Sequence, residues 1–246
     1  MGVSSVLKVI GIGINTVLLA PMVVAVAAFD EDRAYRLCRL WVRINLLLCG
    51  IRVRARREAA LDPRTPYVFM SNHATHVDVL AVVAALPDIQ LRWVAKRELT
   101  RVPVFGWALR NAGNIIVDRS NHEQAMRSLR AARQQMARGV SVMIFPEGTR
   151  GPGDGAMLPF KRGGFVLAEE TQVPIVPIAI TGSTAVLARR DWRIRGGEID
   201  VLIGAPIAVA GADHDSLMRR VRDRLDTMLG TARAPESVPM RMAGAR

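Results

Sequence analysis

The chain has 246 residues, enough to bury one substantial core, so one main domain is expected. Its net charge of +12 and pI near 11.2 indicate an anionic partner: nucleic acid, anionic lipid or a phosphorylated substrate. The sequence carries no zinc-finger, basic-zipper or RNA-binding signature, which makes nucleic acid the weakest of these partners. The two cysteines, Cys38 and Cys49, exclude a disulfide framework, because on one helix they would lie about 16 Å apart.

An uncharged segment of 21 residues runs from Val9 to Phe29. As a helix it would extend about 31 Å, enough to cross a bilayer core, although two glycines and Pro21 weaken it. It could also lie partly embedded in the membrane, be a signal peptide, or be a buried helix. The signal-peptide alternative is weakest, because Lys8 is the only charge in front of the segment and Pro21 interrupts it.

A second helix is predicted from Arg33 to Leu48. Its apolar residues recur at helical spacing, whereas Arg36, Arg39 and Arg43 share the other side. Such a helix suits a membrane interface, where each arginine contributes about 1 kcal/mol on anionic lipid, but it could equally pack on the protein core with a solvated basic face. Residues 1–50 are therefore predicted to form a two-helix membrane anchor, and the arginines favour the cytoplasmic face of the inner (plasma) membrane.

From residue 51 to 230 strands and helices alternate, which predicts an α/β domain with a mixed, mostly parallel sheet flanked by helices. Strands are expected at 51–56, 66–70, 91–95, 114–117, 141–145, 173–180 and 198–203, and helices at 77–86, within 97–109, at 120–138, after 164 and at 215–229. Two prolines, Pro174 and Pro177, favour an edge strand or a bulge. The tail from 231 to 246 has no apolar period and is expected to be disordered.

A polar turn, Ser71 to Asp78, follows the strand 66–70 and precedes a helix. Because open α/β sheets keep their sites at the carboxyl ends of strands, this turn is a candidate site. If the turn folds back, the Asp78 carboxylate can bond one ring nitrogen of His73 and leave the other free to take a proton. Taken alone, a loop histidine beside a helix-start aspartate explains the pattern equally well.

Three later motifs also follow the predicted sheet strands. The four segments, in order, are Asn72-His73-x4-Asp78, Gly113-x4-Asp118-Arg119, Phe145-Pro146-Glu147-Gly148-Thr149-Arg150 and Val173-Pro174-Ile175-Val176-Pro177-Ile178. Each segment is expected to end at the carboxyl end of a strand. Their order and spacing resemble the glycerolipid acyltransferase family, of which lysophosphatidate acyltransferase is the best-known type, over about Tyr67 to Ile180. The resemblance implies that 51–230 is an acyltransferase domain.

The resemblance also implies roles for individual positions. His73 matches the catalytic base of the family and Asp78 its orienting carboxylate. The acceptor phosphate side would comprise Arg119, Glu147, Gly148, Thr149 and Arg150, with Lys161 adding charge, and the acyl-donor side Val173, Pro174, Ile175 and Pro177. One departure is Gly151, where many members have serine, and it is expected to loosen the acceptor loop.

The chemistry of these side chains agrees with most of this assignment. Arg119 and Arg150 are forked cations suited to a phosphate monoester, although a solvated surface charge is the commoner fate of an arginine. A carboxylate repels phosphate, so Glu147 is expected to bridge to one of these arginines or to accept a hydrogen bond from an acceptor hydroxyl.

The expected reaction is acyl transfer from acyl-CoA or acyl carrier protein to 1-acylglycerol 3-phosphate (lysophosphatidate), giving phosphatidate, with no metal or cofactor. His73 would act as general base, Asp78 would stabilise the imidazolium, and backbone N–H groups at the helix start would hold the oxyanion. No acyl-enzyme is expected, because the only nearby hydroxyl nucleophile of note, Ser71, lies on the opposite side of the extended chain and no Gly-x-Ser-x-Gly elbow is present. Alternatives are another acceptor, such as glycerol 3-phosphate or a lyso-amino-lipid, and a non-catalytic basic lipid-binding protein.

Overall fold

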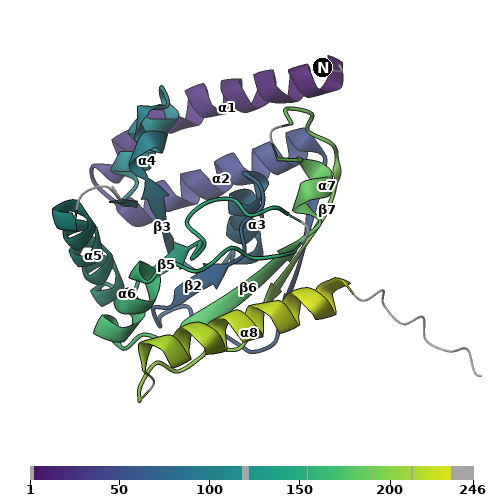
Figure 1. Cartoon of the computed structure of the whole chain (residues 1–246). Helices are drawn as coiled ribbons and strands as arrows, with labels where there is room; N and C mark the ends of the chain where they lie inside the picture. The colour runs from purple at the N-terminus through teal and green to yellow at the C-terminus, as the bar shows by residue number, and fades with distance from the viewer. Residues whose placement is uncertain (1–2, 118–121, 154, 190, 212, 234–246) are drawn as a thin grey trace, which may run out of the picture.

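The computed structural model describes residues 3–117, 122–153, 155–189, 191–211 and 213–233, with the backbone alone at 122–125 and 232–233. The described strands are β1 (Ile51–Arg57), β2 (Val68–Ser71), β3 (Leu91–Lys96), β4 (Ile115–Val117), β5 (Ser141–Ile144), β6 (Ile175–Thr181) and β7 (Gly197–Ile203). They form one sheet in the order β1-β7-β6-β2-β5-β3-β4 (Figure 1). Neighbours pair in parallel except β6 with β7, which confirms the predicted mixed, mostly parallel sheet.

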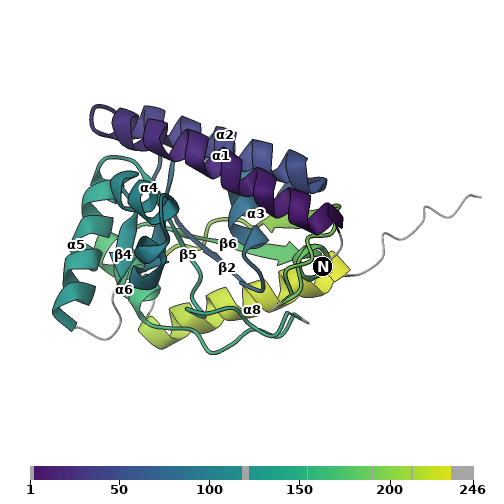
Figure 2. The same ribbon diagram turned by 90° about the horizontal axis from the view of Figure 1, so that it is seen from above.

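Helices cover both faces of this sheet. They are α1 (Val3–Ala27), α2 (Glu31–Cys49), α3 (Val77–Ala85), the 3-10 turn η1 (Arg97–Arg101), α4 (Phe105–Asn111), α5 (His122–Ala137), α6 (Gly163–Thr171), α7 (Ser183–Val186) and α8 (His214–Arg233). One apolar core joins α2 and α3 to the sheet, and a second joins α5, α6 and α8 to its other face. Figures 1 and 2 show these layers, with α1 lying outside α2.

The predicted edge position of the proline-containing strand is wrong, because β6 lies between β7 and β2. Pro177 is tolerated there because of where β7 ends. Its carbonyl accepts the Gly204 N–H at 2.8 Å, just past Ile203, the last residue of β7. The donor that proline lacks is therefore missing only at the end of the β6–β7 ladder, where its loss disturbs little.

The chain turns sharply between α1 and α2. Asp30 caps α2, because its carboxylate accepts the N–H groups of Asp32 at 2.9 Å and Arg33 at 2.8 Å. At the other end, Gly50 adopts φ +66° and ends the helix in the left-handed conformation that glycine permits.

Among the described helices only α1 is long and apolar enough to cross a membrane. The second predicted anchor helix, α2, is amphipathic and contributes to the core. A polar cluster joins the two helices: Asn15 Nδ2 donates to Asn45 Oδ1 at 2.9 Å, and Trp41 Nε1 donates to Thr16 Oγ1 at 3.0 Å. Polar groups paired inside an apolar helix pair fix its packing, so α1 and α2 form one unit.

Both ends of α1 are also attached to the rest of the protein. Near its start, Lys8 Nζ donates to Ile194 O at 3.1 Å. Near its end, Val23 packs with Ala34 of α2 and Ala112, which follows α4. The helix therefore lies along the domain and does not project from it, as Figure 2 shows.

Two terminal or loop predictions meet the limits of the described residues. The helix α8 continues to Arg233, three residues into the tail predicted to begin at 231, and residues 234–246 lie outside the described part. Ser120 and Asn121, the first two residues of the helix predicted at 120–138, lie outside it as well.

Candidate active site

The turn between β2 and α3 folds back on itself as predicted. His73 Nδ1 lies 2.9 Å from Asp78 Oδ2. The same oxygen accepts the N–H groups of Ala74 at 2.7 Å and Thr75 at 2.8 Å. Asp78 is 1% exposed, whereas the His73 ring keeps 15% of its surface exposed. The carboxylate therefore binds one ring nitrogen, and Nε2 is the nitrogen that can exchange a proton with a substrate.

Asp78 also fixes the backbone of the turn, because it occupies the N–H groups of Ala74 and Thr75. Both groups precede α3, which begins at Val77, so the expected oxyanion donors at the helix start remain a prediction. Ser71, the other candidate nucleophile near His73, is fully buried. Its hydroxyl donates to the Asn72 carbonyl at 2.9 Å.

An aromatic ring from the third motif supports His73. Phe145, immediately after β5, stacks on the imidazole with ring centroids 3.9 Å apart and planes 11° apart. Trp93 of β3 lies behind it at 5.8 Å. The imidazole is thus held by Asp78 at its edge and by Phe145 on its face. The motif included Phe145, but its contact with His73 depends on β5 pairing with β2, which the sequence pattern does not specify.

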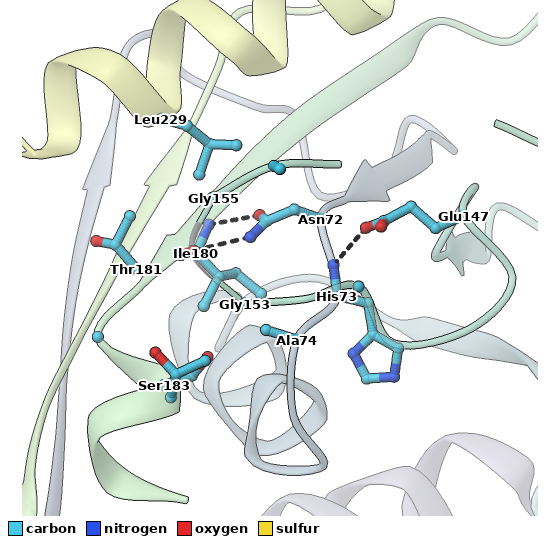
Figure 3. A pocket seen from close by; sticks show the side chains of 14 residues that line it. Asn72, His73, Ala74, Glu147, Gly153, Gly155, Ile180, Thr181, Ser183 and Leu229 are labelled. Atoms are coloured by element: carbon cyan, nitrogen blue, oxygen red, sulfur yellow. Dashed lines mark hydrogen bonds between the residues drawn. The ribbon is translucent and has the colours of Figure 1, made fainter. Parts of the chain in front are cut away.

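Glu147 connects the third motif to the first. Its side chain is 2% exposed, and Oε1 accepts the His73 N–H at 2.9 Å (Figure 3) while Oε2 accepts the Leu158 N–H at 2.8 Å. Burial raises the pKa of Glu147, and the two N–H donors oppose that rise. Within the described residues no ion pair joins Glu147 to Arg150, so that predicted bridge is absent.

Gly151 is a close-packed residue and does not loosen the loop, contrary to expectation. Its N–H donates to the His73 carbonyl at 2.7 Å. A Cβ atom at this position would lie 2.8 Å from Glu147 Oε2. Glycine therefore lets the loop approach the carboxylate, and the backbone of His73 is bonded on both its N–H and its C=O.

A residue outside all four motifs supports this arrangement. Arg222 of α8 donates to Met157 O at 2.9 Å and to Leu158 O at 3.0 Å. Its guanidinium also lies 5.2 Å from the centre of the Phe160 ring. The Leu158 N–H binds Glu147, and Glu147 binds the His73 N–H, so α8 helps to fix the segment that contacts the Ser71–Asp78 turn. No signal in the sequence distinguishes Arg222 from the other arginines of α8.

The predicted phosphate-binding residues lie in different surroundings. Thr149 and Lys161 are exposed, Arg150 is half-buried and Gly148 is buried, with φ +71°. Burial lowers the pKa of His76, the residue just before α3, and the Arg150 cation adds to this lowering. Arg119 and Asp118 lie outside the described residues.

The fourth motif does not lie at the carboxyl end of a strand, contrary to the prediction. Val173 and Pro174 precede β6, and Ile175 to Ile178 are buried in its first half. The end of β6 reaches the site instead: the Asn72 side-chain amide bonds the backbone N–H and C=O of Ile180 at 2.8 and 2.9 Å (Figure 3). Asn72 thus connects the Ser71–Asp78 turn to β6.

A cavity of about 210 Å³ lies on one side of the turn. Its lining includes Asn72, Ala74, Gly153, Thr181, Ser183 and Leu229. The imidazole of His73 points away from these residues (Figure 3). His73 is itself one of the lining residues, so the cavity lies next to the turn, although the ring is directed elsewhere.

Comparison with known proteins places the site in a family. A family model described as acyltransferase matches residues 52–181. Human 1-acyl-sn-glycerol-3-phosphate acyltransferase alpha is 36% identical over 197 residues, 78% of this chain and 69% of the human protein. The 1-acyl-sn-glycerol-3-phosphate acyltransferase of Saccharomyces cerevisiae is 28% identical over 196 residues, 77% of this chain and 64% of the yeast protein.

A solved structure shares the fold. It is the crystal structure of the 1-acyl-sn-glycerophosphate (LPA) acyltransferase PlsC from Thermotoga maritima, which has a TM-score of 0.78 with this chain at 21% sequence identity. The match covers 96% of this chain and 97% of the Thermotoga chain. The family model spans more than half of the chain, and the human relative is matched over more than two thirds of its length. The chain therefore belongs to the acyltransferase family, as its four motifs predicted.

Proposed function

We propose that the protein transfers an acyl group from an acyl thioester to the free hydroxyl of 1-acylglycerol 3-phosphate and so produces phosphatidate for phospholipid synthesis. The observation that carries this proposal is the paired, partly exposed imidazole of His73 in the family's first motif. The names of the human and yeast relatives support the acceptor.

The acceptor hydroxyl attacks the thioester carbonyl while His73 Nε2 takes its proton. Asp78, bonded to Nδ1, stabilises the imidazolium that forms. The tetrahedral intermediate then breaks its C–S bond, and the proton passes from His73 to the leaving thiolate. The step is direct, because the buried Ser71 hydroxyl has no access to a thioester.

We assign the acceptor phosphate to Arg119, Arg150 and Lys161, with Gly148 and Thr149 shaping the turn that carries Arg150. Glu147 belongs to the same motif but acts through the backbone of His73. The fourth-motif residues Val173, Pro174, Ile175 and Pro177 influence the acyl-donor side indirectly, because they set the position of β6 beside β2.

The helices within residues 1–50 hold the enzyme on a membrane, and 51–230 form the acyltransferase domain. The two attachments of α1 to the domain support a helix that lies along the membrane surface and not across it. The basic side of α2 favours the anionic cytoplasmic face of the inner (plasma) membrane.

Replacing Arg150 by alanine is expected to raise the KM for the acceptor about tenfold or more, with a smaller effect on kcat, because a lost charge-assisted contact to phosphate weakens ground-state binding. Steady-state kinetics at saturating donor measures this. The exposed Arg64 provides a matched control, since its alanine variant should behave as the wild type. If the substitution changed only the KM for the acyl donor, Arg150 would belong to the acyl-donor side and not to the acceptor side.

The function is tested by acyl transfer in detergent with lysophosphatidate, glycerol 3-phosphate or a lyso-amino-lipid as acceptor. Each acceptor is supplied with acyl-CoA and, separately, with acyl carrier protein, and the His73→Ala variant controls for contaminating activity. Phosphatidate formed from lysophosphatidate is the expected result. Transfer to another acceptor would retain the mechanism and change the substrate. No transfer to any acceptor would favour the lipid-binding alternative.

A further inference from the structure

Trp192 lies in the segment Asp191–Arg195, between α7 and β7, and is 73% exposed. This segment is outside the four motifs and beyond the residues 52–181 that the family model matches. Tryptophan is highly buried on average, although single exposed apolar residues are common and need no explanation. For Trp192, however, the neighbouring residues indicate a role for the exposed ring.

The segment is a fixed scaffold. Ile194 packs against the core, and the Arg195 N–H donates to Val186 O at 2.8 Å. Arg193 donates to the Asp191 carboxylate from its backbone N–H at 3.0 Å and from Nε at 3.1 Å. These bonds lower the pKa of Asp191 to about 2, so the carboxylate stays ionised. The indole is therefore presented outward by an ordered turn, which reduces the entropy lost on binding.

The same segment touches α1. Lys8, the one charged residue of that helix, donates from Nζ to the Ile194 carbonyl at 3.1 Å. Figures 1 and 2 both show the loop that leads into β7 beside the N-terminal end of α1. The outer side of α1 carries exposed apolar residues, namely Leu7, Ile10, Ile14, Val17 and Leu18. At its other end, Phe29 is 93% exposed. Exposed aromatic residues thus flank both ends of the apolar helix.

We propose that Trp192 enters the membrane–water interface beside the start of α1, so that the segment 191–195 is a second membrane contact, distinct from the α1–α2 pair. Indole rings favour the headgroup level, where the ring is desolvated and its N–H stays hydrogen-bonded. The segment has two exposed arginines, Arg193 and Arg195, and one aspartate, Asp191, so its net charge is positive. A positive charge favours binding to anionic lipid. The segment contacts α1 at Lys8, next to the exposed Leu7, and this closeness to an apolar helix surface favours a bilayer over a protein partner.

Vesicle sedimentation tests this proposal with the full chain and vesicles of phosphatidylcholine and phosphatidylglycerol. Trp192→Ser should require about tenfold more lipid for half-maximal binding, and Trp192→Phe should recover most of the affinity. Met126 of α5, also exposed and apolar, provides the matched control, and Met126→Ser should bind as the wild type. Because residue 192 is exposed, its variants should keep the wild-type melting temperature.

Fluorescence gives a direct readout. The emission of the wild type minus that of Trp192→Phe reports Trp192 alone. Added vesicles should shift this difference to shorter wavelength, and a quencher in the lipid headgroup region should reduce it. Unchanged difference emission, or wild-type vesicle binding by Trp192→Ser, overturns the proposal. A blue shift that depends on protein concentration without lipid would assign Trp192 to a contact between copies of the chain. Neither measurement requires acyl transfer, so failure here is separable from failure of the proposed function.

Discussion

Replacing His73 by alanine is expected to lower kcat by about 10³-fold or more, because the acceptor hydroxyl then has no positioned base. Vesicle binding should be unchanged, since the imidazole contacts Asp78 and Phe145 and not the α1–α2 surface. Initial rates of phosphatidate formation, measured beside a vesicle-binding assay, test both statements. Near-normal turnover in His73→Ala would exclude general-base catalysis by this residue.

Asp78→Asn is the matched companion to this variant. The amide keeps the size of the carboxylate but cannot stabilise an imidazolium, and a loss of about 10²- to 10⁴-fold in kcat is expected. Residues that act as one unit give non-additive losses, so the double variant should be no slower than His73→Ala alone. A further loss in the double variant would mean that Asp78 acts separately from His73, for example by holding the Ala74 and Thr75 turn.

The His73–Asp78 contact could be predicted from the sequence because it is local. Five residues separate the partners, and the two N–H groups that complete the turn lie between them. The strands and helices were predictable for the same reason, since apolar period and turn residues act over short distances. The buried β6 is the exception. Its prolines predict an edge strand or a bulge, but the position at which β7 ends determines whether the missing N–H donor disturbs the sheet.

The rest of the site depends on contacts between distant segments, which the pattern of residues does not encode. Phe145 reaches His73 only because β5 pairs with β2. From the sequence, Gly151 predicts a loosened loop, whereas its close approach to Glu147 depends on the tertiary fold. Arg222 comes from α8, outside all four motifs. A motif thus identifies residues that share a site, whereas the role of each residue depends on its tertiary contacts.

Glu147→Gln is expected to lower kcat about 10- to 100-fold with little change in the acceptor KM. Two backbone donors converge on the carboxylate, and an amide offers one oxygen, so the N–H of either His73 or Leu158 would face the amide nitrogen. A buried donor left without an acceptor costs about 1–3 kcal/mol, and a shift of the base by a fraction of an ångström slows proton transfer. Glu170→Gln, an exposed change on α6, is the control. An increase in acceptor KM at unchanged kcat would instead place Glu147 on the acceptor.

The same substitution should change how stability depends on pH. Burial raises the pKa of Glu147 above its ordinary value of 4.5, so the folded protein holds this proton more tightly than the unfolded chain does. Below that value both states are protonated and the carboxyl group is buried as a neutral group. As pH rises above 4.5 the unfolded chain ionises first, and the wild type loses stability until the folded pKa is passed. Glu147→Gln has no such titration. Denaturant unfolding across this window should therefore show the wild type losing stability relative to the variant as pH rises, and a constant difference would mean that burial does not perturb this carboxylate.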